Sequence, residues 1–454
     1  MTSEMYETDA SAALLERCRR DEIVHPDYGG YCIEGVPGTA AGVLGVDVGQ
    51  PDPSGVSDVS ASLPAETLGG AVGASSPAEA HSDVSHPDLS QVVVLVIDGL
   101  GWHRFHRDAS DRRFVGRFLE RGSVTPLTSV LPSSTGAAIP TLHTGAPPAE
   151  HGVLGWDVRL PEHDAIVEAF PHAVRDGVEE TTPPIPPSGV VRSEPIYPAL
   201  EAADVETRVV QPAGTLGTAY ANATFRGATQ VPYDGIEDGA EVLRSVLESS
   251  AGPSYTYVYV PDVDAVSHTS GSDSAAYHEV LETVCSALAR ALYDDLDAAT
   301  ARETLLLVTA DHGFVDFDPG PEGCLDPTTI QAVADALERR PNGDPVPPWG
   351  DYRVSHLAVR DGERATVRRT LEARGAIVFD DETVTDVELF GPAPSSAFQR
   401  RCGDLVCTHP ERKIVHPAAE RIVPKIGMHG GPTARELLVP FAAARVSRLR
   451  CENE

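Results

Sequence analysis

Three apolar segments of the chain each end next to an acidic residue. They are VVVLVI (92–97), SYTYVYV (254–260) and TLLLVTA (304–310), and they are followed by Asp98, Pro261-Asp262 and Asp311-His312. Short runs that are apolar on both faces are typical of central strands in a parallel sheet. Amphipathic stretches at 236–249 and 273–298 lie between the runs. This alternation predicts an α/β fold with a doubly wound, mostly parallel sheet flanked by helices.

The acidic residues after these strands predict a metal site. Ligands of open α/β sheets bind beyond the carboxyl ends of the strands, so the side chains there converge on one rim. Asp264 and His268 are four residues apart and would share a face of a helix, with Asp262 as the alternative to Asp264. Each residue alone is explained by a turn or a helix cap. Together they form a set of oxygen and imidazole ligands suited to zinc or manganese.

Two other segments contain candidate functional residues. Ser133, Ser134 and Thr135 precede a predicted helix. A hydroxyl there either caps the helix or acts as a nucleophile where backbone N–H groups attract a phosphate. His429 lies in GMHGG (427–431), whose glycines allow close backbone approach or simply form a flexible loop. The residues themselves leave both choices open.

Five segments resemble the alkaline phosphatase superfamily, and within it the nucleotide pyrophosphatase/phosphodiesterase-like (type I phosphodiesterase) branch. They are VVVLVIDGLG, SSTGAAIPTLHTG followed by AEHGVLGW, YVPDVDAVSH, VTADHG and GMHGG, and they run in the family order over roughly 91–440. The resemblance implies an alkaline phosphatase-like fold and two divalent metal ions, most often zinc, with manganese as the alternative. It implies that Thr135, nine residues before Thr144-Gly145, is the nucleophile and forms a covalent phospho-threonine. The implied ligands are Asp98, Thr135, Asp311 and His312 for one metal, and Asp264, His268 and His429 for the other.

The expected function is therefore two-metal phosphoester hydrolysis, by a phosphodiesterase or nucleotide pyrophosphatase acting on a small-molecule phosphoester or nucleotide. The sequence departs from the family pattern in one respect: phosphodiesterases of the branch carry an Asn shortly after a His-Gly pair. Here His151-Gly152 leads to Trp156-Asp157 without an Asn, so a phosphomonoesterase remains an alternative. Trp156 either stacks on a substrate ring or packs as a buried aromatic. A degenerate metal-binding scaffold is a third hypothesis, but all seven metal positions hold competent residues.

The composition along the chain predicts four regions. Residues 1–48 are expected to pack on the core. Residues 49–88 contain no Lys, Arg or aromatic residue and are interpreted as a flexible linker or loop. Residues 89–315 together with 426–454 form the expected catalytic core. Residues 316–425 are interpreted as an inserted subdomain or lid with a small α+β fold.

The charge is strongly negative. Asp and Glu total 68 against 35 Lys and Arg, giving −33, and the only lysines are Lys413 and Lys425. Such a surface repels nucleic acid and anionic membranes, so we expect no nucleic acid-binding surface. An acidic interaction protein would concentrate its acidic residues in a tail, whereas here the acidic residues are spread along the chain. We interpret the chain as a halophilic archaeal protein whose self-repulsion is screened by a potassium-rich cytosol.

Neither a membrane segment nor a secretory signal is evident. No apolar run approaches the roughly 18–20 residues of a membrane span, and the first 20 residues lack the basic start and apolar middle of a signal peptide. We therefore expect a soluble, cytoplasmic protein.

The charge leads to a prediction about salt. Dialysis from molar KCl into low-salt buffer should unfold or inactivate the protein, because unscreened carboxylates repel one another. Circular dichroism and activity during a KCl titration measure this. A protein that stays folded and active in low salt would refute the halophilic interpretation.

Overall fold

The computed structural model describes most of the chain. The described residues are 8–20, 22–48, 62–72, 88–177, 185–317, 323–411, 413–416 and 425–450. No helix among them is long and apolar enough to cross a membrane.

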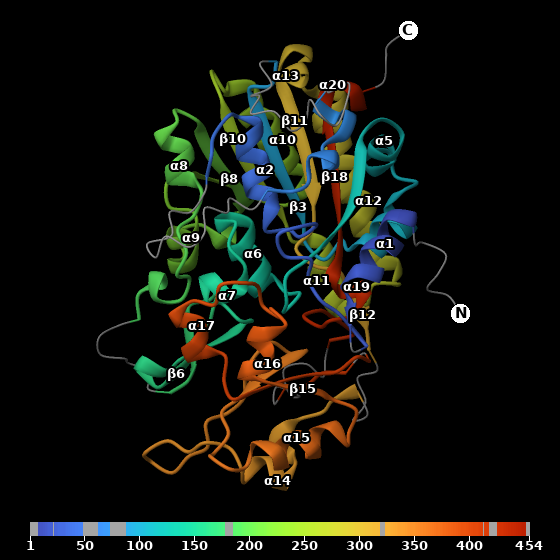
Figure 1. Ribbon diagram of the computed structural model, residues 1–454. Coiled ribbons are helices and arrows are strands. Elements are labelled where there is room, and N and C mark those ends of the chain that lie inside the picture. Colours follow the sequence, from blue (N-terminus) through green and yellow to red (C-terminus); the bar gives the residue numbers. More distant parts are fainter. Residues whose placement is uncertain are drawn as a thin grey trace.

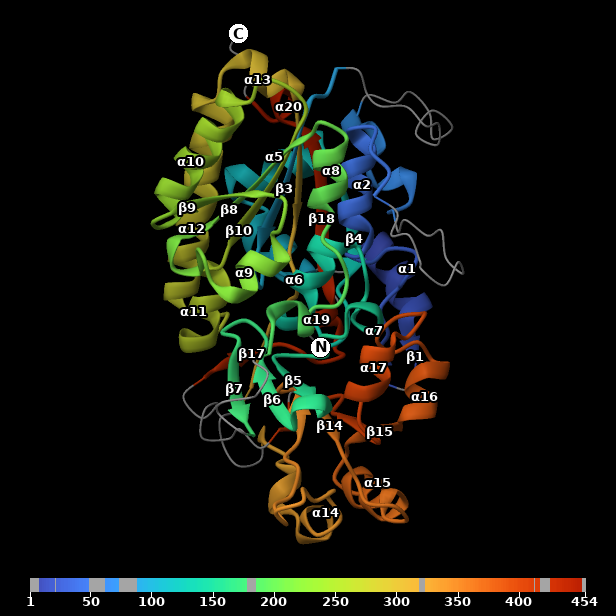
Figure 2. The same cartoon turned by 90° about the vertical axis from the view of Figure 1, so that its left-hand side faces the viewer.

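A seven-stranded, mostly parallel sheet lies between layers of helices in the larger part of the molecule (Figures 1 and 2). The five strands from β11 to β9 are parallel, and β18 runs antiparallel between β11 and β4. This confirms the predicted α/β class. The strand order is β4 (Ser123–Thr128), β18 (Leu438–Arg445), β11 (Thr304–Thr309), β3 (Gln91–Ile97), β10 (Ser254–Val260), β8 (Glu206–Pro212) and β9 (Thr229–Tyr233).

The three apolar runs form the centre of this sheet. Every residue of β3 and β11 is buried, as is every residue of β10 except Tyr259. In the register, Val260 pairs with Ile97 and Thr309 with Val96. The three strands therefore end at the same level, and the residues that follow them meet at one rim.

Helices cover both faces of the sheet. One layer contains α10 (Ile236–Ser249) and α12 (Ala275–Ala289), on which α5 (Arg113–Arg121) packs. The opposite layer contains α2 (Gly35–Val43), α6 (Thr135–Thr144) and α8 (Tyr197–Ala202) (Figure 2). The sequence of α2, GVPGTAAGV, is mostly small residues, and all but one of them are buried. Small side chains allow this helix to lie close to the sheet.

A second, antiparallel sheet forms the lower part of Figure 1. Within the region 316–425, for which a small α+β fold was expected, β14, α15 (Arg364–Glu372) and β15 follow one another, and β16 lies between the two strands in the sheet. Residues 157–176, which the sequence interpretation placed in the catalytic core, supply three strands of the same sheet. Its order is β15 (Ile377–Asp380), β16 (Leu405–Thr408), β14 (Val354–Leu357), β13 (Trp349–Gly350), β5 (Asp157–Leu160), β6 (Ala165–Glu168) and β7 (Ala173–Asp176).

Part of the expected linker is structured. Residues 62–72 contain the short turns η2 (Ala65–Thr67) and η3 (Gly69–Val72), and Leu63 and Ala71 are buried in the core of the large sheet. The remainder, 49–61 and 73–87, lies outside the described residues. The division of the chain into four regions stays a prediction.

Candidate active site

The predicted metal ligands meet at the rim of the large sheet. Asp98 follows β3 and Asp311-His312 follow β11, and all three are buried. Asp264 and His268 lie on α11 (Asp262–Ser270), directly after β10. His429 follows β17 (Gly427–Met428), which pairs with β12 (Val315–Asp316) beside the end of β11. Every ligand position inferred from the sequence therefore belongs to one cluster.

The first group of candidate ligands surrounds His312. Its Nε2 lies 3.2 Å from Asp98 Oδ1, 3.3 Å from Asp311 Oδ2 and 3.1 Å from Thr135 Oγ1. The other oxygen of each carboxylate is held by a protein donor. Asp311 Oδ1 accepts from the backbone N–H groups of Gly99 and His312, and Asp98 Oδ2 accepts from the Tyr259 hydroxyl. One oxygen of each carboxylate is thus left to face the cluster.

The second group is formed by Asp264, His268 and His429. Asp264 Oδ1 lies 3.5 Å from His268 Nε2 and 3.6 Å from His429 Nε2. Asp264 also approaches Asp98 and His312 closely enough to join the two groups. Between Asp98 and Asp264 stands Gly99, whose φ of +74° favours glycine and where a Cβ would lie 3.3 Å from the Asp264 backbone.

Backbone carbonyls set the tautomers of two histidines. His312 Nδ1 is 3.0 Å from the Gly313 carbonyl, and His268 Nδ1 is 2.9 Å from the Gly427 carbonyl. A carbonyl only accepts hydrogen bonds, so each Nδ1 donates to it and each Nε2 is the ring atom that faces the cluster. This is the arrangement found in metal-binding histidines.

The electrostatics of the cluster fit divalent cations. Asp98 Oδ1, Asp264 Oδ1 and Asp311 Oδ2 are buried and accept no hydrogen bond from the described residues. Burial, followed by the charges of Asp311 and Asp264, raises the pKa of Asp98 well above its usual value. Burial, followed by His312 and His268, lowers the pKa of His429 well below its usual value. Crowded buried carboxylates are costly without a cation, and together with the imidazoles they suit one.

Thr135 is the hydroxyl that faces this cluster. It is the first residue of α6, where backbone N–H groups have no partner within the helix. Ser134 occupies the N-cap but makes no capping bond, and Ser133 donates to the Gly431 carbonyl. Among the three candidates, Thr135 is the one whose hydroxyl lies beside His312.

A buried ion pair from the second sheet holds the His429 loop. Arg353, directly before β14, donates from Nε and Nη2 to the two oxygens of Glu436 at 2.8 and 2.9 Å. Glu436 also accepts from the backbone N–H of Gly431 at 2.8 Å. A Cβ at Gly431 would lie 2.6 Å from Arg353 Nε, so this position requires glycine. The two sheets are thus joined at the residue pair that positions His429.

Sequence reasoning missed several residues of the site. Tyr259 holds Asp98, Arg353 holds the His429 loop, and Asp351 accepts from the backbone N–H of Trp156 at 3.2 Å. Burial raises the pKa of Asp351. Each is a single residue without a spacing pattern, and Asp351 and Arg353 approach the site only because the second sheet packs there. Trp156 is half-buried and stacks on Phe170.

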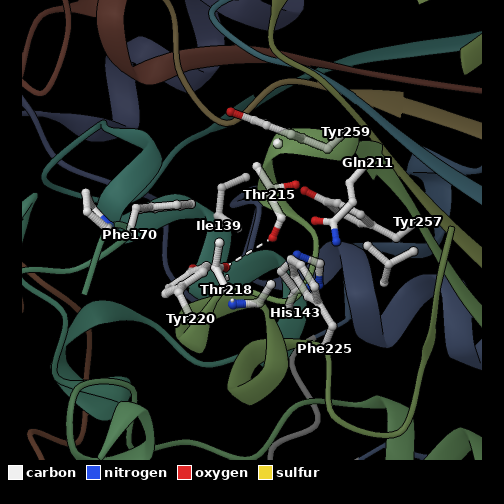
Figure 3. A pocket seen from close by; sticks show the side chains of 14 residues that line it. Ile139, His143, Phe170, Gln211, Thr215, Thr218, Tyr220, Phe225, Tyr257 and Tyr259 are labelled. Carbon is white, nitrogen blue, oxygen red and sulfur yellow. Dashed lines mark hydrogen bonds between the residues drawn. The ribbon is translucent and has the colours of Figure 1, made fainter. Parts of the chain in front are cut away.

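Figure 3 shows a cavity of about 220 Å³ whose wall includes Tyr259, the residue that donates to Asp98. Ile139, one helical turn after Thr135 on α6, and Tyr259 are both part of its wall. Most of the remaining wall is aromatic or aliphatic. Phe170 and Tyr220 stack with ring centroids 4.3 Å apart, so a run of stacked rings leads from Trp156 into the cavity.

Comparisons with known proteins show the family of the chain. The chain matches the type I phosphodiesterase/nucleotide pyrophosphatase family over residues 92–432, so it belongs to that family and is a metal-dependent phosphoester hydrolase. No curated protein sequence matches it.

Solved structures share its fold. Murine ectonucleotide pyrophosphatase/phosphodiesterase 5 superposes with a TM-score of 0.59 and 17% identity, covering 78% of this chain and 87% of that one. An inactive variant of the murine protein in complex with AMP gives 0.58 and 16%, with the same coverage. Phosphonoacetate hydrolase from Sinorhizobium meliloti in complex with phosphonoformate gives 0.56 and 20%, covering 81% and 92%.

We predict that Arg353→Lys weakens metal binding at the His429 side of the cluster. Lysine cannot reproduce the two parallel bonds to Glu436, and loss of a residue that orients a metal ligand typically costs about 10- to 100-fold in metal affinity. Titration with zinc and a competing chelator measures this.

Arg401→Lys is the matched control. Arg401 is equally buried beside the second sheet but donates to the carbonyls of Gly152, Val190 and Gly189. Both variants should lose stability, and only Arg353→Lys should lose metal affinity. Equal metal affinity in the two variants would contradict the positioning role.

Proposed function

We propose that the chain hydrolyses phosphodiesters or nucleotide pyrophosphates through a covalent phospho-Thr135 intermediate, with two metal ions bound by the cluster. The observation that carries the proposal is the position of Thr135 Oγ1, 3.1 Å from His312 Nε2 at the start of α6. Asp98, Thr135, Asp311 and His312 hold one ion, and Asp264, His268 and His429 hold the other. When bound, the ions supply Lewis acidity, which lowers the pKa of the attacking hydroxyl and offsets charge on the phosphoryl group.

The residues of the chain determine the course of the reaction. The first turn of α6 directs its N–H groups at the phosphoryl group, and Thr135 Oγ attacks the phosphorus in line with the leaving oxygen. The Thr135 proton passes to solvent, the bond from phosphorus to the leaving oxygen breaks, and the leaving group takes up a proton. Water then cleaves the phospho-threonine, releases the phosphorylated product and regenerates the hydroxyl.

The cavity beside Thr135 supports a substrate with a large organic group. The stacked rings of Phe170 and Tyr220 in its wall suit an aromatic ring. AMP bound to a structurally similar murine protein agrees with a nucleotide substrate. We assign Trp156, which stacks on the wall residue Phe170, as a further substrate-binding residue.

We propose zinc as the metal, with manganese as the alternative. Four carboxylate or hydroxyl ligands and three imidazoles form the mixed oxygen and nitrogen set that both ions accept. The excess of 68 acidic over 35 basic residues supports our proposal that the enzyme works in the salt-rich cytoplasm of a halophile.

Replacing the nucleophile tests the mechanism. Thr135→Ala should lower kcat by about 10³-fold or more, because the attacking atom is gone. Ser134→Ala, which deletes the neighbouring hydroxyl, should lower kcat by less than about tenfold. Acid quenching during turnover should trap phosphate on the peptide that contains Thr135. Full activity in Thr135→Ala would refute the assignment.

Phosphomonoester hydrolysis is the second candidate function, and Lys425 favours it. A monoester dianion gains from an additional cation. Burial lowers the pKa of Lys425 while the charges of Asp264 and Asp351 raise it, which indicates an ammonium near the cluster.

Substrate preference decides between the two candidates. With zinc or manganese in molar KCl, we expect a higher kcat/KM for bis-p-nitrophenyl phosphate than for p-nitrophenyl phosphate, because the cavity accommodates the second ester group. The reverse preference would establish the monoesterase if it is lost in Lys425→Met but kept in Lys413→Met, which removes the half-buried ammonium that pairs with Glu411.

A further inference from the structure

A segment that precedes the family match contacts the loop that leads to Thr135. The match begins at residue 92, and the segment runs from β2 (Ile23–Val24) to α2, beside β4 (Figure 2). Nothing in the proposed reaction uses these residues. The Leu131 N–H, four residues before Thr135, donates to the Tyr28 hydroxyl at 3.3 Å. The backbone that ends in the proposed nucleophile is therefore held by a part of the chain that lies outside the match.

The same segment fixes the point at which this loop begins. Thr128 is the last residue of β4. Its N–H donates to the Tyr31 carbonyl at 2.7 Å, and its carbonyl accepts from the Ile33 N–H at 3.0 Å. Its hydroxyl accepts from the Asp27 N–H at 2.8 Å. Three hydrogen bonds on one residue hold the base of the loop against the segment.

The loop is attached to the active site on either side of the bond to the segment. Ser129 donates from its hydroxyl to the carbonyl of Asp311, and Ser133 donates to the carbonyl of Gly431. The bond from the Leu131 N–H lies midway between these two attachments. Its loss would release the middle of the loop while both ends stay attached.

The Tyr28 side chain is suited to holding this N–H. Its ring is half-buried and packs against the core of the large sheet. Burial raises the pKa of its hydroxyl well above the usual value, so the hydroxyl stays neutral at physiological pH. Leu131 is fully buried, and a buried N–H without an acceptor costs free energy. The loop would therefore gain by shifting if the hydroxyl were absent.

We propose that Tyr28 is a positioning residue for the nucleophile, because its hydroxyl holds the loop from Ser129 to Ser134 so that Thr135 Oγ lies in line with the phosphorus. The identity of the nucleophile rests on the proposed function. Tyr28 is not among the proposed metal ligands, so its effect should appear in the rate of phosphoryl transfer and not in metal binding. A misplacement of about 1 Å can cost on the order of 10²-fold in rate, so a small shift of the loop is enough.

Tyr28→Phe tests the proposal, because it keeps the ring and removes the acceptor of the Leu131 N–H. Single turnovers of bis-p-nitrophenyl phosphate by the zinc-loaded, full-length protein in molar KCl are quenched with acid, and the phosphorylated Thr135 peptide is quantified by mass spectrometry. We expect phosphorylation to slow roughly three- to tenfold, as for a buried donor left unpaired. The substrate concentration at half-maximal rate and the zinc affinity should change by less than about twofold. An unchanged rate would overturn the proposal.

Tyr31→Phe is the matched control. Tyr31 lies three residues further along the same segment, and its hydroxyl bonds to Glu66 instead of the loop. This variant should phosphorylate Thr135 at the wild-type rate. Equal slowing in the two variants would indicate a general loosening of the segment and would overturn the role assigned to Tyr28.

Hydrogen exchange of the unliganded protein gives a readout that does not need turnover. The Leu131 amide should exchange roughly three- to tenfold faster in Tyr28→Phe than in the wild type, and Tyr31→Phe should leave its exchange unchanged. Unchanged exchange in Tyr28→Phe, or faster exchange without a loss of rate, contradicts the positioning role. Wild-type turnover without a phosphoryl group on Thr135 would refute the proposed function alone, because exchange and kcat of the two variants still decide the role of Tyr28.

Thr128→Val covers the case in which Tyr28→Phe folds poorly. It removes the hydroxyl that accepts the Asp27 N–H, so it detaches the segment at the base of the loop. Phosphorylation of Thr135 should slow in this variant as well. A wild-type rate would show that the segment does not position the nucleophile.

Discussion

Three carboxylates crowd together at the rim of the large sheet, each turning one buried oxygen without a donor toward its neighbours. Asp98 and Asp311 cannot move apart, because the parallel pairing of β3 with β11 fixes their spacing and Tyr259, Gly99 and His312 hold their other oxygens. Repulsion at this rim is the constraint on which the rest of the site depends. Divalent cations would relieve this repulsion, and the imidazoles of the cluster are candidates to complete their coordination.

The second sheet contributes to this centre through two residues. Arg353 and Glu436 form a buried ion pair that also holds the backbone of the His429 loop, and Asp351 fixes the backbone of Trp156. A buried ion pair adds little net stability, but removing one of its two partners leaves the other charge buried and uncompensated. Its value here is geometric, because it connects the sheet that carries most of the proposed ligands to the loop that carries His429.

The sequence predicted the parts of the fold that depend on local pattern. Buried apolar runs identified β3, β10 and β11, and the acids that follow them identified one rim. The pairing of β13 with β5 could not be predicted, because it joins residues far apart in sequence through a single pair, Gly350 and Asp157. The choice of Thr135 over Ser133 and Ser134 depends on how α6 is oriented, which residue type does not reveal. No spacing pattern marks His143, which lines the cavity because its ring lies against Tyr257 of β10 with centroids 4.2 Å apart.

Anomalous diffraction from crystals grown with zinc tests the two-metal centre most directly. Two peaks are expected, one among Asp98, Thr135, Asp311 and His312 and the other among Asp264, His268 and His429. Both peaks should disappear after the crystals are soaked in a chelator. The distance between the two peaks should match the spacing of the two groups of side chains. A single peak, or peaks away from these side chains in an active enzyme, would contradict the two-metal assignment.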